Sequence, residues 1–301
     1  RSTQGVSSAA SDVYKRQTYN GQINASQSAS NYLDGVYTLE SSSNSKFLYA
    51  GSSLGDSISA FSINSATGTL TYIEQHIDNT AGVEGLDGVR DIRISPSGSH
   101  LYTAGFEDNA VAVFSINGTN GQLSFIRSYI NGLNGVRGIQ GATAIAISPD
   151  GKHLYCAGWK GNSVAAFSID DTTGLLTYLG YISSEQSLWS PSDLELTPDG
   201  KHLYITAATS DSLAAFKRDP STGSLSPIGF LKDNMVGIDG LDWASSLEIT
   251  SDGNHILVTA AIDDTITVFK RNPSTGSFTL RGYFRDGDLG VDLSLIHISE
   301  P

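Results

Sequence analysis

The clearest feature of the chain is an alternation of apolar and polar positions that returns after every fifty residues or so. A short segment with apolar residues on both faces ends each time in a phenylalanine, at Phe61, Phe114, Phe167, Phe216 and Phe269. A fixed period of roughly fifty residues is typical of a repeat architecture. The pattern predicts five copies of one unit, covering about residues 31–80, 81–131, 132–182, 183–233 and 234–286.

Each copy contains four segments of strand-like alternation separated by turn residues. In the third copy, residues 143–148 alternate and end in a Pro-Asp-Gly turn, and residues 153–158 and 163–169 follow as two further strands. A loop containing Gly174 then leads into a fourth strand at 175–180. Strands bounded by Gly, Asp and Pro at this spacing predict an antiparallel four-stranded unit.

The third strand of each copy is apolar on both faces. Phe167 lies beside the small Ala165 on one face, and Val164 and Ala166 occupy the other. A two-sheet sandwich would leave one face polar, and a solenoid is the other alternative. Blades stacked face to face cover both faces. The sequence therefore predicts an all-β fold, a β-propeller of four-stranded blades with five complete repeats present.

The two ends of the chain do not continue the repeat. Residues 1–17 and 293–301 resemble translated sequencing-library adapters. We therefore expect a propeller at 18–292 between two non-native, adapter-like segments, and we exclude both ends from the fold argument. Because the native termini would then be missing, a signal peptide cannot be sought, and an extracellular or cell-surface location is a hypothesis only.

Composition narrows the class of partner. The net charge of −13 argues against nucleic acid, because binding a phosphate backbone requires a basic face. Cys156 is the only cysteine, so neither an internal disulfide nor a cysteine-rich metal site can form. The chain contains no apolar run of about 18 residues, so membrane insertion is not expected. We predict no cofactor and no metal.

Several segments carry a resemblance to a known family. The third copy contains Ser-Pro-Asp-Gly-Lys-His-Leu-Tyr at 148–155, then Asn-Ser-Val-Ala-Ala-Phe at 162–167 and Thr-Thr-Gly-Leu-Leu-Thr-Tyr at 172–178. These segments resemble the lactonase-type seven-bladed propellers, a family that includes a 6-phosphogluconolactonase and muconate-lactonizing enzymes. The resemblance covers about residues 31–286 and implies seven blades. The enzymes of that family usually show an Arg-His or His-Pro pair beside the inner strands, and this chain has no equivalent pair.

Two polar columns of the repeat are explained by structure. Histidines precede the second strand of four copies, at His100, His153, His202 and His255. Asp or Asn occupies the turn before every third strand, at Asp56, Asn109, Asn162, Asp211 and Asp264. Asp and Asn tolerate left-handed turn conformations. We interpret both columns as blade-building positions rather than catalytic or calcium-binding residues.

The first strand of each copy carries the more informative polar residues. Charged side chains alternate along these strands, at Glu40, Asp91, Arg93, Asp193, Glu195 and Glu248. In a propeller the first strands line the central channel, so this set predicts either a site for a polar ligand or ion, or paired charges that line a wet tunnel.

The connections between copies are long and unlike one another. They and the neighbouring turns hold Arg137, Trp159, Trp189 and Trp243. An aromatic and cationic rim suits recognition of a sugar, a lactone or a peptide, so these residues, with Asp91 and Glu248, are our candidate ligand-binding set.

Two functions remain open. The leading hypothesis is a non-catalytic binding module of a larger bacterial secreted or surface protein, with a protein or glycan as its partner. The alternative is a lactone hydrolase, in which Arg93 or Arg137 polarises the ester carbonyl and Asp193 or Glu195 activates water. No Gly-x-Ser-x-Gly, Walker, dinucleotide or His-Glu-x-x-His pattern supports another enzyme class.

Overall fold

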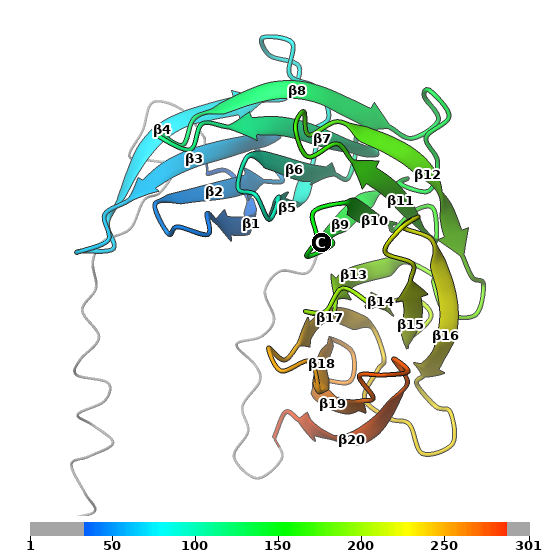
Figure 1. The fold of residues 1–301 in the computed structure, drawn as a ribbon. Helices are drawn as coiled ribbons and strands as arrows, with labels where there is room; N and C mark the ends of the chain where they lie inside the picture. Colours follow the sequence, from blue (N-terminus) through cyan, green and yellow to red (C-terminus); the bar gives the residue numbers. More distant parts are fainter. Residues whose placement is uncertain (1–32, 288–301) are drawn as a thin grey trace, which may run out of the picture.

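The computed structural model describes residues 33–287, which form five antiparallel sheets of four strands each. Within every sheet, strands that follow one another in the chain are hydrogen-bonded neighbours. The sheets succeed one another along an open arc, with the first strand of each on the inner side (Figure 1). The predicted all-β propeller of four-stranded blades is confirmed.

The strands recur in the same order in each blade. The first strands are β1 (Val36–Ser41), β5 (Val89–Ile94), β9 (Ala142–Ile147), β13 (Pro191–Leu196) and β17 (Ala244–Ile249). The second strands are β2 (Phe47–Ser52), β6 (His100–Gly105), β10 (His153–Gly158), β14 (His202–Ala207) and β18 (His255–Ala260). The third strands are β3 (Ser57–Ile63), β7 (Ala110–Ile116), β11 (Ser163–Ile169), β15 (Ser212–Arg218) and β19 (Thr265–Arg271). The outer strands are β4 (Leu70–Ile77), β8 (Leu123–Ile130), β12 (Leu176–Ser183), β16 (Leu225–Lys232) and β20 (Phe278–Arg285).

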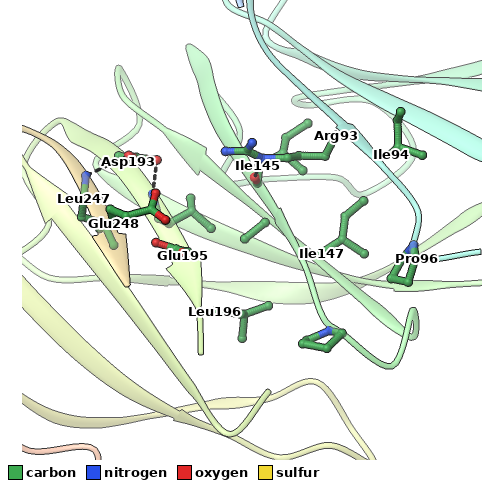
Figure 2. A pocket seen from close by; sticks show the side chains of 13 residues that line it. Arg93, Ile94, Pro96, Ile145, Ile147, Asp193, Glu195, Leu196, Leu247 and Glu248 are labelled. Atoms are coloured by element: carbon green, nitrogen blue, oxygen red, sulfur yellow. Dashed lines mark hydrogen bonds between the residues drawn. The ribbon is translucent and has the colours of Figure 1, made fainter. Parts of the chain in front are cut away.

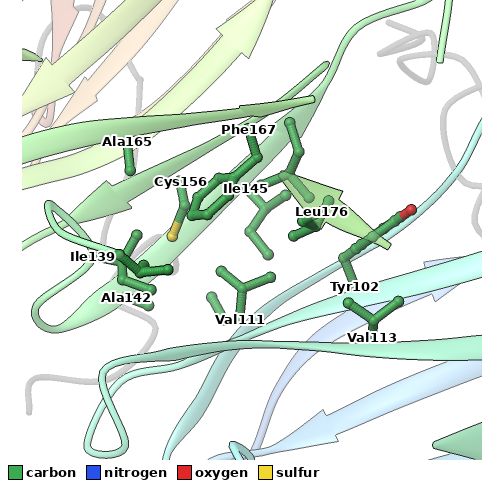
Figure 3. Packing of buried hydrophobic residues seen from close by; sticks show 13 residues of the cluster. Tyr102, Val111, Val113, Ile139, Ala142, Ile145, Cys156, Ala165, Phe167 and Leu176 are labelled. Atoms are coloured by element: carbon green, nitrogen blue, oxygen red, sulfur yellow. The ribbon is translucent and has the colours of Figure 1, made fainter. Parts of the chain in front are cut away.

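The hydrophobic core lies between neighbouring blades. Tyr102 and Val111 of the second blade pack against Ile145, Cys156 and Phe167 of the third (Figure 3). All five of these side chains are fully buried. A large ring from one sheet fills the space beside a small residue of the next, which gives the interdigitated packing of a protein interior. The prediction that third strands are covered on both faces is confirmed.

Tyrosine and histidine side chains tie each blade to the following one. Tyr155 donates a hydrogen bond to the carbonyl oxygen of Gly223 at 2.8 Å. The ring of His153 lies so close to the same glycine that an added Cβ would meet it at 2.3 Å. Arg218 also reaches back, with Nη2 placed 2.7 Å from Nδ1 of His153. These contacts confirm that the histidine column builds the blade interface.

The Asp and Asn column has the expected turn conformation and a further role. Asp56 and Asn109 have positive φ angles of 44° and 55°. Their Oδ1 atoms accept hydrogen bonds from Gly88 and Gly141, which immediately precede the first strand of the next blade, at 3.0 and 2.7 Å. Each turn therefore fixes the entry of the chain into the following sheet.

The predicted non-native segments, residues 1–17 and 293–301, lie outside the described residues, so the proposed domain limits stay predictions. Within residues 33–287 there is no helix of the length and apolarity needed to cross a bilayer.

Candidate active site

The inner face of the arc is built from two side-chain positions of each first strand. Because side chains alternate along a strand, residues two apart point to the same face. One position holds Thr38, Asp91, Ala144, Asp193 and Ser246, and the other holds Glu40, Arg93, Ala146, Glu195 and Glu248. The two alanines of β9 leave space between the charged residues of β5 and those of β13.

That space is a cavity of about 300 Å³. Arg93, Asp193, Glu195 and Glu248 provide its charged lining. Its apolar lining includes isoleucine, leucine and proline side chains, at Ile94, Pro96, Ile145, Ile147, Pro149 and Leu196. Figure 2 shows the guanidinium of Arg93 directed across the cavity toward the carboxyl groups of Glu248 and Asp193. A volume near 300 Å³ is at the small end of ligand pockets.

Arg93 is held in position by its Nε atom. This atom donates a hydrogen bond to the carbonyl oxygen of Ile145 at 3.0 Å. Arg93 Nε also lies 3.5 Å from Asp91 Oδ2, and Nη1 lies 3.9 Å from Glu40 Oε2. The bond of Nε to Ile145 therefore fixes the orientation of the guanidinium beside the cavity.

Asp91 and Asp193 connect first strands to one another. Asp91 Oδ2 accepts the N–H of Ile145 at 2.8 Å. Asp193 Oδ2 accepts hydrogen bonds from Ser246 Oγ at 2.9 Å and from the N–H of Leu247 at 3.0 Å. Burial raises the pKa of Asp91 to about 7, against the opposing charge of Arg93, and burial likewise raises the pKa of Asp193. The two aspartates are therefore anchored groups at the base of the site.

Glu195 has a strongly perturbed carboxyl group on the cavity wall. Its Oε2 accepts the N–H of Ile249 at 2.7 Å. Burial, together with the neighbouring charges of Glu248 and Asp193, raises the pKa of Glu195 to about 8 against the lowering effects of the Ile249 hydrogen bond and of Arg93. Glu248 is exposed on the cavity side. A carboxyl group that titrates near neutrality is suited to acid–base work.

The predicted rim residues lie elsewhere. Trp189 and Trp243 stand before the first residues of β13 and β17, whereas Pro96 and Pro149 of the cavity follow the last residues of β5 and β9. The tryptophans are therefore at the opposite end of the first strands from these prolines. Trp159 and Trp243 contact each other, with ring centroids 6.0 Å apart.

Arg137 is also remote from the cavity. It is exposed in the connection before β9, near Tyr178 of the outer strand β12. Of the nine predicted site residues, the structure brings Arg93, Asp193, Glu195 and Glu248 together around the cavity, with Asp91 behind Arg93. Arg137 and the three tryptophans do not line it. The sequence did not point to Ser246, which donates a hydrogen bond to Asp193 of the neighbouring first strand. It also did not point to Pro96 and Pro149, which line the cavity.

One acidic cluster at the junction of the fourth and fifth blades has the ligand types of a cation site. Carboxylate oxygens of Asp233, Asp239 and Asp263 lie within 4.8 Å of one another. Arg285 Nη2 lies 3.3 Å from Asp239 and 3.4 Å from Asp263, so the cluster has its own counter-charge. None of these residues lines the cavity.

Comparison with known proteins gives relatives of the same kind. A fungal protein from Arthroderma benhamiae, named "Probable 6-phosphogluconolactonase", is 26% identical over 140 residues, which are 44% of this chain and 34% of that protein. The chain thus spans about a third of the length of this curated relative.

Solved structures share the fold. The periplasmic gluconolactonase of Pseudomonas aeruginosa has a TM-score of 0.69 at 18% identity, over 85% of this chain and 71% of that one. A protein from Lactobacillus plantarum has a TM-score of 0.71 at 18% identity, over 83% and 71%.

The leading sequence hypothesis, a non-catalytic binding module, is wrong. The relatives named for lactone chemistry and the matching family model favour the enzyme alternative instead. The chain lacks the Arg-His or His-Pro pair that is usual in the enzymes of this family, but the family assignment does not depend on that pair. The model of the family described as "Lactonase, 7-bladed beta-propeller" matches residues 12–137 and 81–235. The chain therefore belongs to the lactonase family of seven-bladed β-propellers.

Proposed function

We propose that this protein hydrolyses a lactone in the cavity between β5, β13 and β17. The observation that carries the proposal is the placement of Arg93 opposite Glu195 and Glu248 around one small cavity. Ester hydrolysis requires two groups. One is a cation that can polarise the carbonyl, and the other is a carboxyl group that can move a proton. Membership of the lactonase family supports the same reaction class.

The reaction begins with the lactone carbonyl oxygen accepting a hydrogen bond from a terminal nitrogen of Arg93. Water then adds to the carbonyl carbon, and the Glu195 carboxylate takes the proton that the water loses. Negative charge develops on the former carbonyl oxygen, and Arg93 stabilises it. The ring C–O bond breaks next, and Glu195 returns the proton to the departing alkoxide. One lactone and one water thus give one open-chain hydroxy acid.

Asp193 is a positioning residue in this scheme. Its two oxygens are bonded to Ser246 and to the N–H groups of Leu194 and Leu247, so they hold β17 beside β13. This contact also fixes Glu248, which follows Leu247 directly in β17. The assignment of the proton transfer to Glu195 rather than Asp193 follows from these occupied oxygens.

The test is steady-state hydrolysis of D-glucono-1,5-lactone, followed by acid release in a pH-stat with the non-enzymatic rate subtracted. We expect Glu195→Gln to lower kcat by about 100-fold or more, as is usual for loss of a general base. Arg93→Gln should lower kcat by about 100- to 1,000-fold, as for loss of one oxyanion donor.

Matched controls come from residues outside the cavity. Arg127 and Glu84 line a separate groove beside β8 and β12. Arg127→Gln and Glu84→Gln make the same chemical changes away from the cavity and should leave kcat unchanged. Wild-type rates in folded Arg93→Gln and Glu195→Gln proteins would reject the proposed function.

A further inference from the structure

The charges around the cavity are strongly unbalanced. Among the described residues that line it, Arg93 is the only basic side chain, and three carboxyl groups face it. Asp91 and Glu40 lie behind Arg93, at 3.5 and 3.9 Å. Arg93 therefore already has carboxyl partners before any substrate arrives.

Several backbone donors of the site are also occupied. Four inner-strand carboxylates each accept an N–H from the next first strand, in the pairs Glu40 with Ile94, Asp91 with Ile145, Asp193 with Leu247, and Glu195 with Ile249. Proteins bind phosphate through arginine forks, free backbone N–H groups or the N-terminus of a helix. Residues 33–287 form no helix. The described lining of the cavity therefore offers one arginine and no helix N-terminus.

Basic residues next to the cavity do not change this balance. Lys152 and Lys201, in the turns after β9 and β13, do not line the cavity. Lys201 is paired with Asp199 at 3.3 Å. Arg90 lies near the start of β5, where its guanidinium is stacked over the rings of Tyr37 and Phe106.

The same lining suits a neutral polyol. Carboxylates accept hydrogen bonds from hydroxyl groups, and Glu248 and Glu195 offer such acceptors toward the cavity. Resting on the lactonase function proposed above, we infer that the substrate is an uncharged, hydroxyl-bearing lactone and that phosphorylated lactones are rejected. Specificity thus arises from repulsion of a phosphate as well as from hydroxyl recognition.

The test compares D-glucono-1,5-lactone with 6-phospho-D-glucono-1,5-lactone on the 301-residue protein. We expect kcat/KM to favour the uncharged lactone by about 100-fold, because like charges placed together across a binding site are strongly disfavoured. Equal or preferred turnover of the phosphorylated lactone would overturn the inference and keep the lactonase function. No turnover of either lactone would instead overturn the lactonase function itself.

A charge variant tests the cause of the discrimination. Glu248→Gln removes one negative charge from the exposed side of the cavity, so the ratio of kcat/KM for phosphorylated over plain lactone should rise about 10-fold. The ratio cancels any effect that the variant has on both substrates. Glu84→Gln removes the same charge from the outer groove and should leave the ratio unchanged. An unchanged ratio in a folded Glu248→Gln protein, or an equal rise in the control, would contradict an electrostatic origin of the discrimination between the two lactones.

Discussion

Replacement of Arg218 by isoleucine tests how much the contacts between blades contribute to stability. Arg218 is buried at the end of β15, with 3% exposure. Its Nη2 lies 2.9 Å from both carboxylate oxygens of Asp150, and Nη1 donates to the carbonyl oxygen of Gly200 at 3.1 Å. Isoleucine is the residue that the preceding blade carries at the same position, Ile169. The variant therefore removes the charge without introducing a foreign side chain.

The expected loss in unfolding free energy is about 3 kcal/mol. Removing one partner of a buried ion pair costs roughly 3–5 kcal/mol. Asp150 is about one-third exposed and can regain water, which places the loss at the lower end. The measurement is urea denaturation at pH 7. Arg127→Ile, on the exposed outer strand β8, is the control and should change stability by less than about 1 kcal/mol.

The pH dependence adds a second readout. Burial would raise the pKa of Asp150, but hydrogen bonds from Ser148 and Arg218 lower it to about 2. A carboxyl group with a depressed pKa stabilises the folded protein above its ordinary pKa near 4, and this contribution disappears as the pH falls through 2. The difference in unfolding free energy between wild type and Arg218→Ile should therefore become smaller between pH 4 and pH 2. No gap at pH 7, or one that stays constant to pH 2, would refute the reasoning.

Three further outcomes follow from the contacts described. Gly223→Ala should lower the unfolding free energy by more than about 2 kcal/mol in urea titrations, because φ is +72° and the new Cβ would collide with His153; wild-type stability would contradict this. Phe167→Ala should cost about 3–5 kcal/mol in the same assay, since the ring is fully buried between blades; a loss below 1 kcal/mol would show that the interface repacks. Lactone hydrolysis should increase as the pH rises through about 8, where Glu195 becomes a carboxylate, and Glu248→Gln should move this midpoint to lower pH because a neighbouring negative charge is removed; a midpoint shared by both proteins would exclude Glu195 as the titrating base.

The sequence predicted the blades well because their signals are local. Phenylalanine beside a small residue, a turn glycine and an Asp or Asn at the hairpin recur in each copy, and each has a short-range physical reason. The differences in the third blade are small: the first strand, predicted at 143–148, is observed at Ala142–Ile147, and the fourth strand, predicted at 175–180, is observed at Leu176–Ser183. Its far end pairs with β11 beyond the point where the alternation fades.

The candidate site was predicted only in part, since it depends on contacts between blades. Alternation placed Arg93, Glu195 and Glu248 on the inner strands, and the structure brings them to one cavity. Conspicuous tryptophans suggested a binding rim, yet they lie at the opposite end of the strands. Nothing local shows that Asp193 would be bonded to Leu247, because that contact joins residues 54 positions apart.

One set of bonds between blades runs forward along the chain, whereas Arg218 reaches back to Asp150 and His153 of the preceding blade. Tyr155, Asn109 and Asp193 each reach from their own blade to the next, and the group that they meet is a backbone C=O or N–H. Because every amino acid except proline supplies both groups, the receiving blade needs no particular side chain at the contact. A whole repeat can therefore be duplicated or removed while the remaining neighbours still find their partners. At these backbone contacts, copying one unit adds a blade without coordinated mutations, whereas a contact such as that of Arg218 with Asp150 requires matched side chains on both blades.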